Sequence, residues 1–365
     1  MSETTKETPN RDVLLDFIRG LATILVVLGH TIQFCSGKVS RQEGLFFYNK
    51  LFILIYSFHM PLFAILSGYS FFFSSKKREV TELITHQIKT LILPIVSWNL
   101  LEFLLLNILG NFKGLSFYPL VKKFFSNTIY SFWFLWGIFF CSMIIVSIEK
   151  LIKINWLRTS IYCFVLIIGH LIIPAKYNLY LYFFLYPFFL TGFMANKYEF
   201  RKQFCKKKTF LIGAFSIFLF ALLIKFYNWD CYVYNTKIAL YGSALNPIEQ
   251  ITIDIYRLFI GIIGSASTIF IAKVFYKLIC YFPQKIILHF ITKTGQQSLG
   301  IYILNSYACI YFLPRLFDGV KNYSTLLWIM ITVVTIPMYM MILSTIYKFP
   351  YVSYFLLGKK MNQSK

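Results

Sequence analysis

The chain has 365 residues, of which 58% are hydrophobic and 20% aromatic, and its mean hydropathy is +0.65. Soluble domains are about 25% charged, whereas only 14% of this chain is charged. Long apolar runs recur along the whole length. Composition therefore excludes a soluble domain with a single anchor and indicates a polytopic membrane protein.

The charge of +22 comes from 36 Lys and Arg against 14 Asp and Glu. These basic residues lie in short loops between apolar segments, where the positive-inside rule places them. A nucleic-acid interface would need a contiguous basic patch on a soluble module, so we expect a lipid bilayer as the partner and no nucleic acid. The seven cysteines are scattered without a CxxC pair, so neither a disulfide framework nor a metal site is expected.

Runs of about 20 apolar residues mark the expected membrane spans. The first run follows a polar N-terminus and lacks a small-x-small cleavage site, so we interpret it as a retained span. The fold class is all-α, with about ten transmembrane helices and both termini cytoplasmic. The expected spans are 14–34, 46–73, 91–110, 130–148, 159–174, 178–195, 209–227, 250–272, 297–313 and 325–346.

Basic loops set the expected orientation. If the N-terminus is cytoplasmic, the Lys-rich segments 76–78, 197–208 and 273–293 all lie on the cytoplasmic side. We expect a cytoplasmic tail at 1–13, a single transmembrane domain at 14–346 and a basic cytoplasmic tail at 347–365. Any chemistry must therefore come from residues of the spans and their connecting loops.

The first span carries an unusual polar stripe. Arg19 and His30 are eleven residues apart, which places them about 20° apart around a helix and roughly 16 Å apart along it. Asp16 lies one turn before Arg19, within reach of its side chain. Arg19 could simply reach the interface and pair with Asp16, and His30 could be a hydrogen-bonded core histidine. Together they favour a bundle interior or a water-filled cavity, because ionisable groups at membrane depth are costly.

Other polar residues in the spans are further candidates for a substrate site or pore. His59 precedes Pro61, and a proline in a span frees carbonyls that usually line a cavity; packing is the alternative. Glu102 is an isolated carboxylate near the middle of its span, where it must be paired with a partner, protonated or hydrated. Arg257, at the expected external end of its span, could hold substrate oxygens or extend toward the interface.

Three residues near the C-terminus, Ser298, Tyr302 and Asn305, share a helical face and form a candidate inner wall. Trp133 belongs either to an interfacial aromatic belt or to a surface that stacks on a sugar ring. The loop 228–249 offers Tyr232, Tyr234 and Tyr241 for the same purpose, although nothing in the sequence singles them out.

The stretch RDVLLDFIRGLATILVVLGH, residues 11–30, resembles the opening signature of the membrane acyltransferase-3 family, LDxxRGxAxxxVVxxH. In that signature an Arg or Lys and a His are separated by ten residues, as Arg19 and His30 are here. The resemblance extends over nearly the whole chain, to a subgroup of sugar O-acetylases acting on fucose-type or other surface-glycan residues. It rests on FHMPLFAILSGYSFFF (58–73), FWFL (132–135), YPFFLTGFMANKY (186–198), YRLFIGIIGS (256–265) and TGQQSLGIYILN (294–305).

The resemblance implies transfer of an acyl group, usually acetyl, from cytosolic acyl-CoA to a hydroxyl of a cell-surface glycan or lipid-linked sugar in a bacterial plasma membrane. No tightly bound cofactor is implied, because acetyl-CoA is a substrate. Arg19 would bind the phosphates of CoA, His30 would act as general base or acyl carrier, and Asp16 would orient Arg19 or a neighbouring donor. The family often has His where this chain has Asn305, and an amide cannot act as a base.

The main alternative is a transporter or flippase of a glycan precursor, since buried charges also suit that class. Transporters often contain internal repeats, and we find none between the two halves of the sequence. The other large class of membrane O-acyltransferases carries its histidine in a late apolar run, which does not match a first-span His30. An inactive structural homologue would have no need of the Arg19 and His30 spacing.

Overall fold

The computed structural model of the protein describes residues 12–112, 114, 116–171, 178–199, 206–238, 245–282, 285–318 and 324–358. Within these ranges all regular secondary structure is helical, which confirms the expected all-α class. The α-helices are α1 (Val13–Phe34), α2 (Lys38–Gln42), α3 (Lys50–Tyr56), α4 (His59–Lys77), α5 (Val80–Gln87), α6 (Leu93–Ile108), α7 (Phe117–Tyr130), α8 (Trp133–Leu151), α9 (Asn155–Leu171), α10 (Leu179–Lys197), α12 (Lys206–Leu223), α13 (Pro247–Tyr281), α14 (Ile286–Gln296), α15 (Ser298–Tyr307), α16 (Leu313–Leu316), α17 (Thr325–Tyr347) and α18 (Pro350–Leu357).

Short 3₁₀ and π-helical turns join several of these helices. The 3₁₀ turns are η1 (Leu45–Tyr48), η4 (Ile224–Phe226) and η5 (Trp229–Cys231). Two π-helical turns, η2 (Ile88–Ile92) and η6 (Ala308–Phe312), run directly into α6 and α16. Single π turns inside α-helices occur frequently at functional sites.

Eight described helical segments are long and apolar enough to cross a membrane. They overlap eight of the ten expected spans. Most ends differ by a few residues, but Val80–Ile108 begins 11 residues before the expected 91–110, and Pro247–Tyr281 ends nine residues after the expected 250–272. Together these eight segments identify the chain as a multi-pass membrane protein. They are Val13–Phe34, Lys50–Lys77, Val80–Ile108, Trp133–Leu151, Leu179–Lys197, Lys208–Phe226, Pro247–Tyr281 and Thr325–Tyr347.

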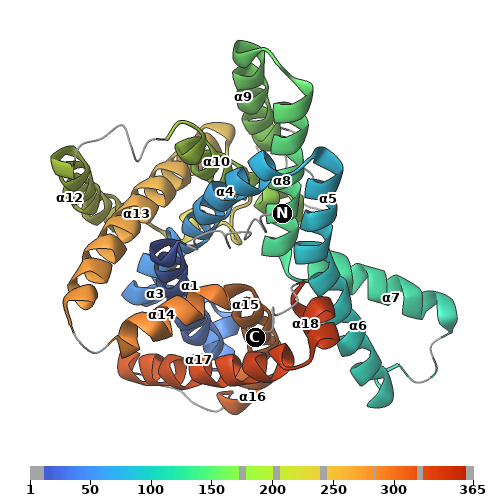
Figure 1. The fold of residues 1–365 in the computed structure, drawn as a ribbon. Coiled ribbons are helices and arrows are strands. Elements are labelled where there is room, and N and C mark those ends of the chain that lie inside the picture. The colour runs from blue at the N-terminus through green and yellow to red at the C-terminus, as the bar shows by residue number, and fades with distance from the viewer. Residues whose placement is uncertain are drawn as a thin grey trace, which may run out of the picture.

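The two remaining expected spans are also helical but shorter or interrupted. The fifth, expected at 159–174, corresponds to the 17-residue α9. The ninth, expected at 297–313, corresponds to α15, η6 and α16 in succession, where the π turn interrupts the regular helix. In Figure 1, α9 and α7 extend away from the rest of the bundle.

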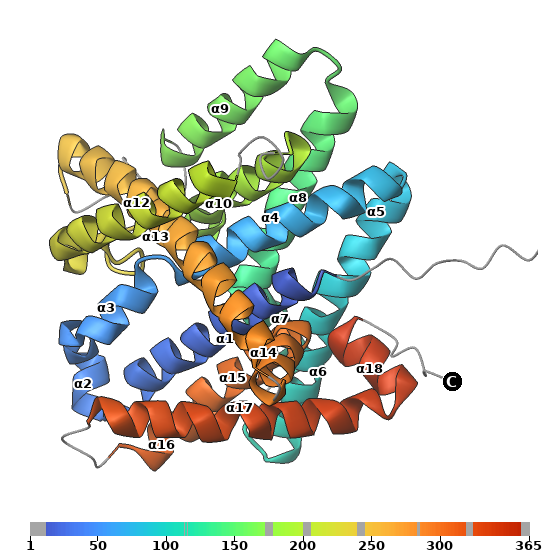
Figure 2. The same cartoon turned by 60° about the vertical axis from the view of Figure 1, so that its left-hand side comes forward.

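Helix α1 lies in the interior of the bundle, where it contacts α3, α4, α13, α14, α15 and α17 (Figures 1 and 2). Its crossing with α14 is a backbone-to-backbone contact. A Cβ on Gly20 would lie 1.9 Å from the carbonyl oxygen of Ile291, and one on Gly295 would lie 1.8 Å from that of Asp16. Small residues permit such close crossings in membrane bundles, so Gly20 fixes the position of the first span.

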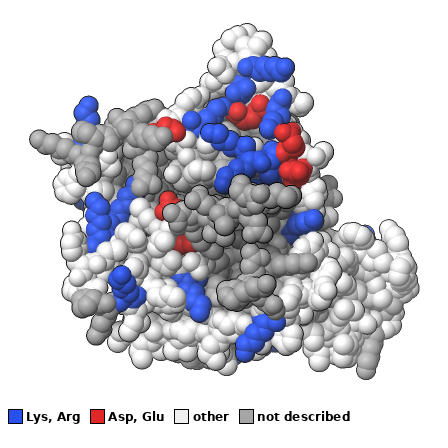
Figure 3. All heavy atoms as spheres, in the orientation of Figure 1, with Lys and Arg blue, Asp and Glu red and all other residues white. Residues whose placement is uncertain are grey.

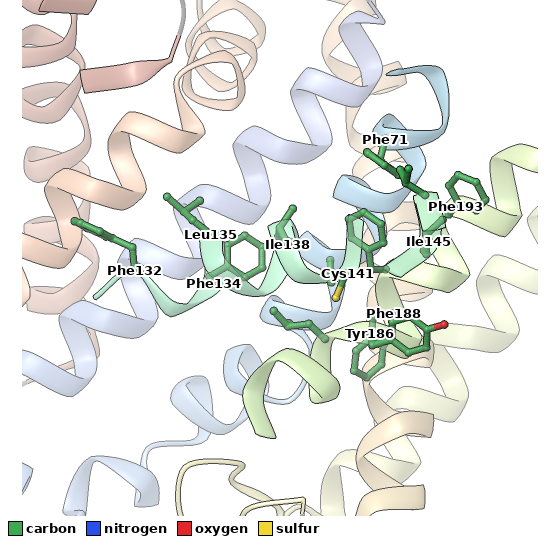
Figure 4. Packing of buried hydrophobic residues seen from close by; sticks show 14 of the residues in the cluster. Phe71, Phe132, Phe134, Leu135, Ile138, Cys141, Ile145, Tyr186, Phe188 and Phe193 are labelled. Carbon is green, nitrogen blue, oxygen red and sulfur yellow. The ribbon is translucent and has the colours of Figure 1, made fainter. Parts of the chain in front are cut away.

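A second close crossing joins α4 to α10 through Gly68 and Gly192, each of which faces a carbonyl oxygen of the other helix. Around it lies the largest hydrophobic cluster, which is centred on α8. Figure 4 shows its side chains along α8, from Phe132 to Ile145, with Phe71 of α4 and Phe193 of α10 nearby. This packing fixes α8 against the interior helices.

Large apolar side chains also cover much of the outer surface, as expected for helices that face lipid. The face shown in Figure 3 carries many more Lys and Arg than Asp and Glu. At the end of the bundle where α1 begins, Lys76, Lys150 and Lys197 line a shallow pocket, and Lys197 pairs with Glu149 at 2.6 Å. Exposed apolar residues include Leu100, Leu101, Leu104, Leu105, Phe215, Phe218, Ile255, Phe259, Val333, Val334 and Met341.

The expected C-terminal tail contains a helix that packs on the bundle. Helix α18 contacts α6 and α17, and the indole nitrogen of Trp98 donates to the carbonyl oxygen of Leu356 at 2.8 Å. Of the two expected tails, residues 1–11 and 359–365 lie outside the described residues.

Candidate active site

A large cavity among the described residues has a volume of about 660 Å³ and follows α1 from its second turn to beyond its last. Its lining begins with Arg19, passes His30, and reaches Phe34 and Arg41, a path of roughly 22 Å along α1. Ligand sites typically measure about 300–1,000 Å³ and combine an apolar lining with a few placed polar groups. Eight of the expected site residues line this cavity: Arg19, His30, His59, Glu102, Trp133, Ser298, Tyr302 and Asn305.

Arg19 lies at the end of the cavity where α1 begins. Its guanidinium donates a hydrogen bond to the hydroxyl of Ser70 on α4, and its own carbonyl accepts one from Thr23 at 2.8 Å. The side chain is only partly buried. A guanidinium has five donor hydrogens in a fixed fork, a geometry that suits a phosphate or other anion.

His30 lies in the middle of the cavity wall and contacts α15. The amide nitrogen of Asn305 is 2.6 Å from His30 Nδ1, and the hydroxyl of Tyr339 is 3.4 Å from the amide oxygen of Asn305. Asn305 is 1% exposed. A buried amide therefore fixes the plane of the imidazole and leaves Nε2 as the nitrogen without that contact.

The orientation of the Asn305 amide decides which nitrogen of His30 carries the proton. With its NH₂ group toward Nδ1, the neutral ring is protonated on Nε2. With its oxygen toward Nδ1, the amide accepts from Nδ1–H, and Nε2 has a free lone pair. Both orientations keep Tyr339 bonded, because a hydroxyl can donate or accept. Proton abstraction by Nε2 requires the second orientation.

His59 is the second imidazole of the cavity. Its Nδ1 lies 3.0 Å from the carbonyl oxygen of Ile55, and because a carbonyl only accepts, Nδ1 carries the proton and Nε2 is a free acceptor. The helix is interrupted between α3 and α4 at this point. Pro61 lies in the first turn of α4, where a backbone N–H has no partner within the helix, so the missing N–H of proline loses no hydrogen bond. Pro61 therefore belongs to a helix start and not to a kink within a continuous span.

Glu102 lines the cavity from α6. Its carboxylate accepts hydrogen bonds from Tyr307 at 3.4 Å and from Tyr311, which lie before and within the π turn η6. Two phenol rings of one helix therefore hold a carboxylate of another. A carboxylate has about four acceptor positions, so Glu102 can receive further hydroxyl donors from the cavity.

Aromatic side chains form a further part of the cavity wall. Trp133 opens α8 after Phe132, whose φ of 45° is in the left-handed region that a bulky residue adopts only under constraint. Trp133 faces Tyr234 with ring centroids 6.0 Å apart, and Tyr232 lies 5.2 Å from Tyr234. Burial raises the pKa of the Tyr232 hydroxyl above its ordinary value, so this group stays neutral. Tyr241 lies outside the described residues.

Two expected site residues lie elsewhere. Among the described residues that line the large cavity, Asp16 is absent; it is buried, and its carboxylate accepts from Gln296 at 3.3 Å. Arg257 borders two smaller pockets, and its guanidinium binds the carboxylate of Asp254 and backbone carbonyls of the loop that follows α12. It therefore neither offers free donors to the large cavity nor extends to an interface.

Some residues of the site were not predicted from the sequence. Gln33 and Tyr56 line the cavity beside the two histidines, and Tyr56 donates to Gln33 at 2.7 Å. Gln33 is one turn after His30 on the same face of α1, so the helical period could have found it. Tyr56, Tyr307 and Tyr311 are three of 26 tyrosines, and only the fold distinguishes them.

Comparison with known proteins decides the family. The sequence profile of the acyltransferase-3 family, described as an acyltransferase domain, matches residues 12–358. The chain belongs to this acyltransferase family. The match includes the α1 stripe and reaches the end of α18, so the resemblance inferred from residues 11–30 is confirmed, and so is the expected enzyme class, an acyltransferase.

Two relatives are nodulation proteins named NolL. The protein from Sinorhizobium fredii is 28% identical over 243 residues, which cover 64% of this acyltransferase and 62% of that relative. The protein from Mesorhizobium japonicum is 25% identical over 311 residues, or 81% and 76% of the two chains. The acyltransferase thus spans less than two thirds of the first relative's length. No solved structure gives a significant match.

Proposed function

We propose that this acyltransferase moves an acyl group, most simply acetyl, from cytosolic acyl-CoA to a hydroxyl of a cell-surface glycan or lipid-linked sugar. The observation that carries the proposal is the contact of Asn305 with His30 in the wall of a cavity that also reaches Arg19. A base, its orienting group and an anion-binding guanidinium are the parts that acyl transfer from CoA requires.

Arg19 binds the donor in this proposal. The phosphates of CoA carry negative charge, and the guanidinium of Arg19, which lines the cavity, binds such anions through charge-assisted hydrogen bonds. The pantetheine arm then extends along α1, and the roughly 16 Å from Arg19 to His30 matches an extended chain of that kind. Asp16 lies one turn before Arg19 and accepts a hydrogen bond from Gln296, so it holds this part of α1 in position.

His30 is the general base. Its Nε2 takes the proton of the acceptor hydroxyl as the oxygen attacks the thioester carbonyl carbon, and the resulting oxyanion collapses with cleavage of the C–S bond. The imidazolium then returns the proton to the CoA thiolate. Asn305, with its oxygen toward Nδ1–H, holds the required tautomer and stabilises the imidazolium, as an amide does in other base-and-orienter pairs.

A covalent variant uses the same residues. In it, His30 Nε2 attacks the thioester, releases CoA, and passes the acyl group to the acceptor in a second step. His59, whose Nε2 is a free acceptor beside Tyr56, would then take the proton of the acceptor hydroxyl. The two routes differ in kinetics, because only the covalent one releases CoA before the acceptor binds.

The acceptor side of the cavity is the half beyond His30. Glu102 and Trp133 line the cavity and provide a carboxylate and a flat ring. Ser298 and Tyr302, which precede Asn305 on α15, add hydroxyls on the side toward Arg19. Sugars carry hydroxyls around a ring with apolar faces, so this lining suits a carbohydrate. Substrate sites commonly combine aromatic walls with a few polar groups in this way.

We place the protein in a bacterial plasma membrane with ten crossings and both termini cytoplasmic. Helix α9 and the interrupted α15–α16 segment supply the two crossings beyond the eight long helices. The cluster of Lys76, Lys150 and Lys197 marks the cytoplasmic end under the positive-inside rule. The transmembrane domain then runs from 14 to 346, with cytoplasmic tails at 1–13 and 347–365.

Kinetics of the purified protein in lipid nanodiscs test the proposal. Transfer of labelled acetyl from acetyl-CoA to methyl glycosides is measured for wild type, His30→Gln and Arg19→Ala. We expect His30→Gln to bind acetyl-CoA normally and to lose transfer by about 10²–10⁴-fold. Arg19→Ala should raise the donor KM instead. Near-normal turnover by His30→Gln would refute its role, and sugar flux without transfer in wild type would favour a transporter.

A further inference from the structure

Arg257 connects α13 to both ends of the segment 230–237. Its Nε donates to the carbonyl of Cys231 at 2.9 Å, and its terminal nitrogens reach the carbonyls of Asp230 at 2.7 Å, Thr236 at 2.6 Å and Lys237 at 3.2 Å. The side chain is 3% exposed. One guanidinium thus closes an eight-residue loop onto the bundle, which a single point charge could not do.

The ion pair with Asp254 keeps that guanidinium in place. Asp254 accepts from Arg257 at 2.8 Å and from Gln250 at 3.0 Å, and Gln250 also donates to the carbonyl of Lys237 at 2.8 Å. A buried charge pair with this many hydrogen bonds is compensated on both sides. The loop is therefore held in one conformation by a network that lies outside the large cavity.

The closed loop presents two tyrosines to the large cavity. Tyr232 and Tyr234 both line it, and Tyr234 faces Trp133 of α8 across 6.0 Å. Tyr234 is 40% exposed, whereas Tyr232 is 6% exposed. Tyr234 and Trp133 therefore offer ring surface to an occupant of the cavity, while the more buried Tyr232 packs against Tyr234 with ring centroids 5.2 Å apart.

This aromatic wall is adjacent to the histidines. The hydroxyl of Tyr232 accepts from Gln33 at 3.4 Å, and Gln33 also accepts from Tyr56 at 2.7 Å. The ring of Tyr56 is 6.4 Å from that of His30 and 4.5 Å from that of His59. A molecule packed on Tyr234 would thus lie near both imidazoles, in the half of the cavity that is beyond His30 from Arg19.

We propose that Tyr234 and Trp133 form the subsite for the pyranose ring of the acceptor, and that Arg257 is the residue that positions this subsite. The proposal rests on the proposed function, whose acceptor site it specifies. Aromatic rings match the apolar faces of a sugar, and tyrosine hydroxyls and Gln33 can bond its rim. The two rings themselves carry no charge.

Two measurements test the subsite in the full-length protein. Methyl α-L-fucoside and methyl β-D-glucoside are titrated against purified protein by intrinsic fluorescence, and acceptor and donor KM are measured with labelled acetyl-CoA. Tyr234→Ala should raise the acceptor KM at least about fivefold and leave the donor KM unchanged. Tyr234→Phe should retain most affinity, and Tyr118→Ala, an exposed ring on α7, should behave as wild type.

Arg257→Lys tests the positioning role, because lysine keeps the charge but cannot reach four carbonyls. It should raise the acceptor KM and leave acetyl-CoA binding unchanged. An unchanged acceptor KM in both Tyr234→Ala and Arg257→Lys would overturn the inference, as would a raised donor KM, which would mean that the wall binds CoA. Sugar binding that Tyr234→Ala abolishes, with no transfer in wild type, would instead refute the proposed function and keep the subsite.

Discussion

The contact between Asn305 and His30 makes a quantitative prediction about catalysis. Their side-chain nitrogens are 2.6 Å apart in a buried part of the cavity. A hydrogen bond to a group that becomes charged contributes about 1.5–3 kcal/mol, which corresponds to a factor of about 10–150 in rate. Asn305→Ala should therefore lower kcat by about 10–150-fold, with little change in either KM, because the amide touches the base and not the substrate.

The orientation of the amide can be tested with Asn305→Asp. A carboxylate only accepts hydrogen bonds, so it can hold the Nδ1–H tautomer of His30 but cannot donate to Nδ1. We expect Asn305→Asp to keep more activity than Asn305→Ala. A control, Tyr339→Phe, removes only the 3.4 Å contact to the amide and should change kcat by less than about fivefold.

A double-mutant cycle supplies the refuting result. If Asn305 acts through His30, then removing it from a His30→Ala background should cost nothing further. Initial rates of labelled acetyl transfer are measured for wild type, both single variants and the double variant at matched protein amounts. A further loss of about 10-fold or more in the double variant would show independent roles and would contradict the proposed orientation of the base.

Three further predictions follow from the geometry. Arg19→Ala should weaken acetyl-CoA binding about 10-fold or more, measured by equilibrium binding, whereas Lys77→Ala at the same end of the bundle should not; equal losses would point to a general charge effect. Gly20→Ala should lower the melting temperature of the detergent-solubilised protein, because its methyl would lie 1.9 Å from a carbonyl of α14 and overpacking costs about 1–3 kcal/mol. Gly137→Ala should be milder, because its methyl meets side chains first, a leucine methyl at 2.7 Å and a tyrosine ring carbon at 3.3 Å; the reverse order would contradict the assigned crossing. Glu102→Gln should raise the acceptor KM while leaving donor binding intact, and an unchanged acceptor KM would show that this carboxylate only holds the tyrosines.

The sequence predicted much of the fold because a membrane span depends on the composition of a short continuous stretch of residues. Eight expected spans coincide with long apolar helices, since a run of about 20 apolar residues has few alternatives in a bilayer. The break between Tyr56 and His59 was not foreseen, because hydropathy does not distinguish one helix from two in line. The π turn at Ala308–Phe312 was missed for the same reason.

The sequence predicts which side chains lie together where they share one helix, but not where they come together from distant helices. Arg19 and His30 lie on one face of α1, so the helical period alone placed them in one cavity. The pairing of His30 with Asn305 joins residues 275 positions apart, which no local pattern encodes. Arg257 shows the converse limit, because an arginine that binds loop carbonyls has the same sequence signature as one that binds a substrate.

The most direct test of the account uses membranes that contain the native acceptors. Membranes from cells expressing wild type or His30→Ala at equal levels are incubated with acetyl-CoA labelled in the acetyl group, and label is followed into glycan and lipid-linked sugar. We expect incorporation with wild type that falls to background in His30→Ala. Equal incorporation in both would contradict the assignment of His30 as the group at the centre of the reaction.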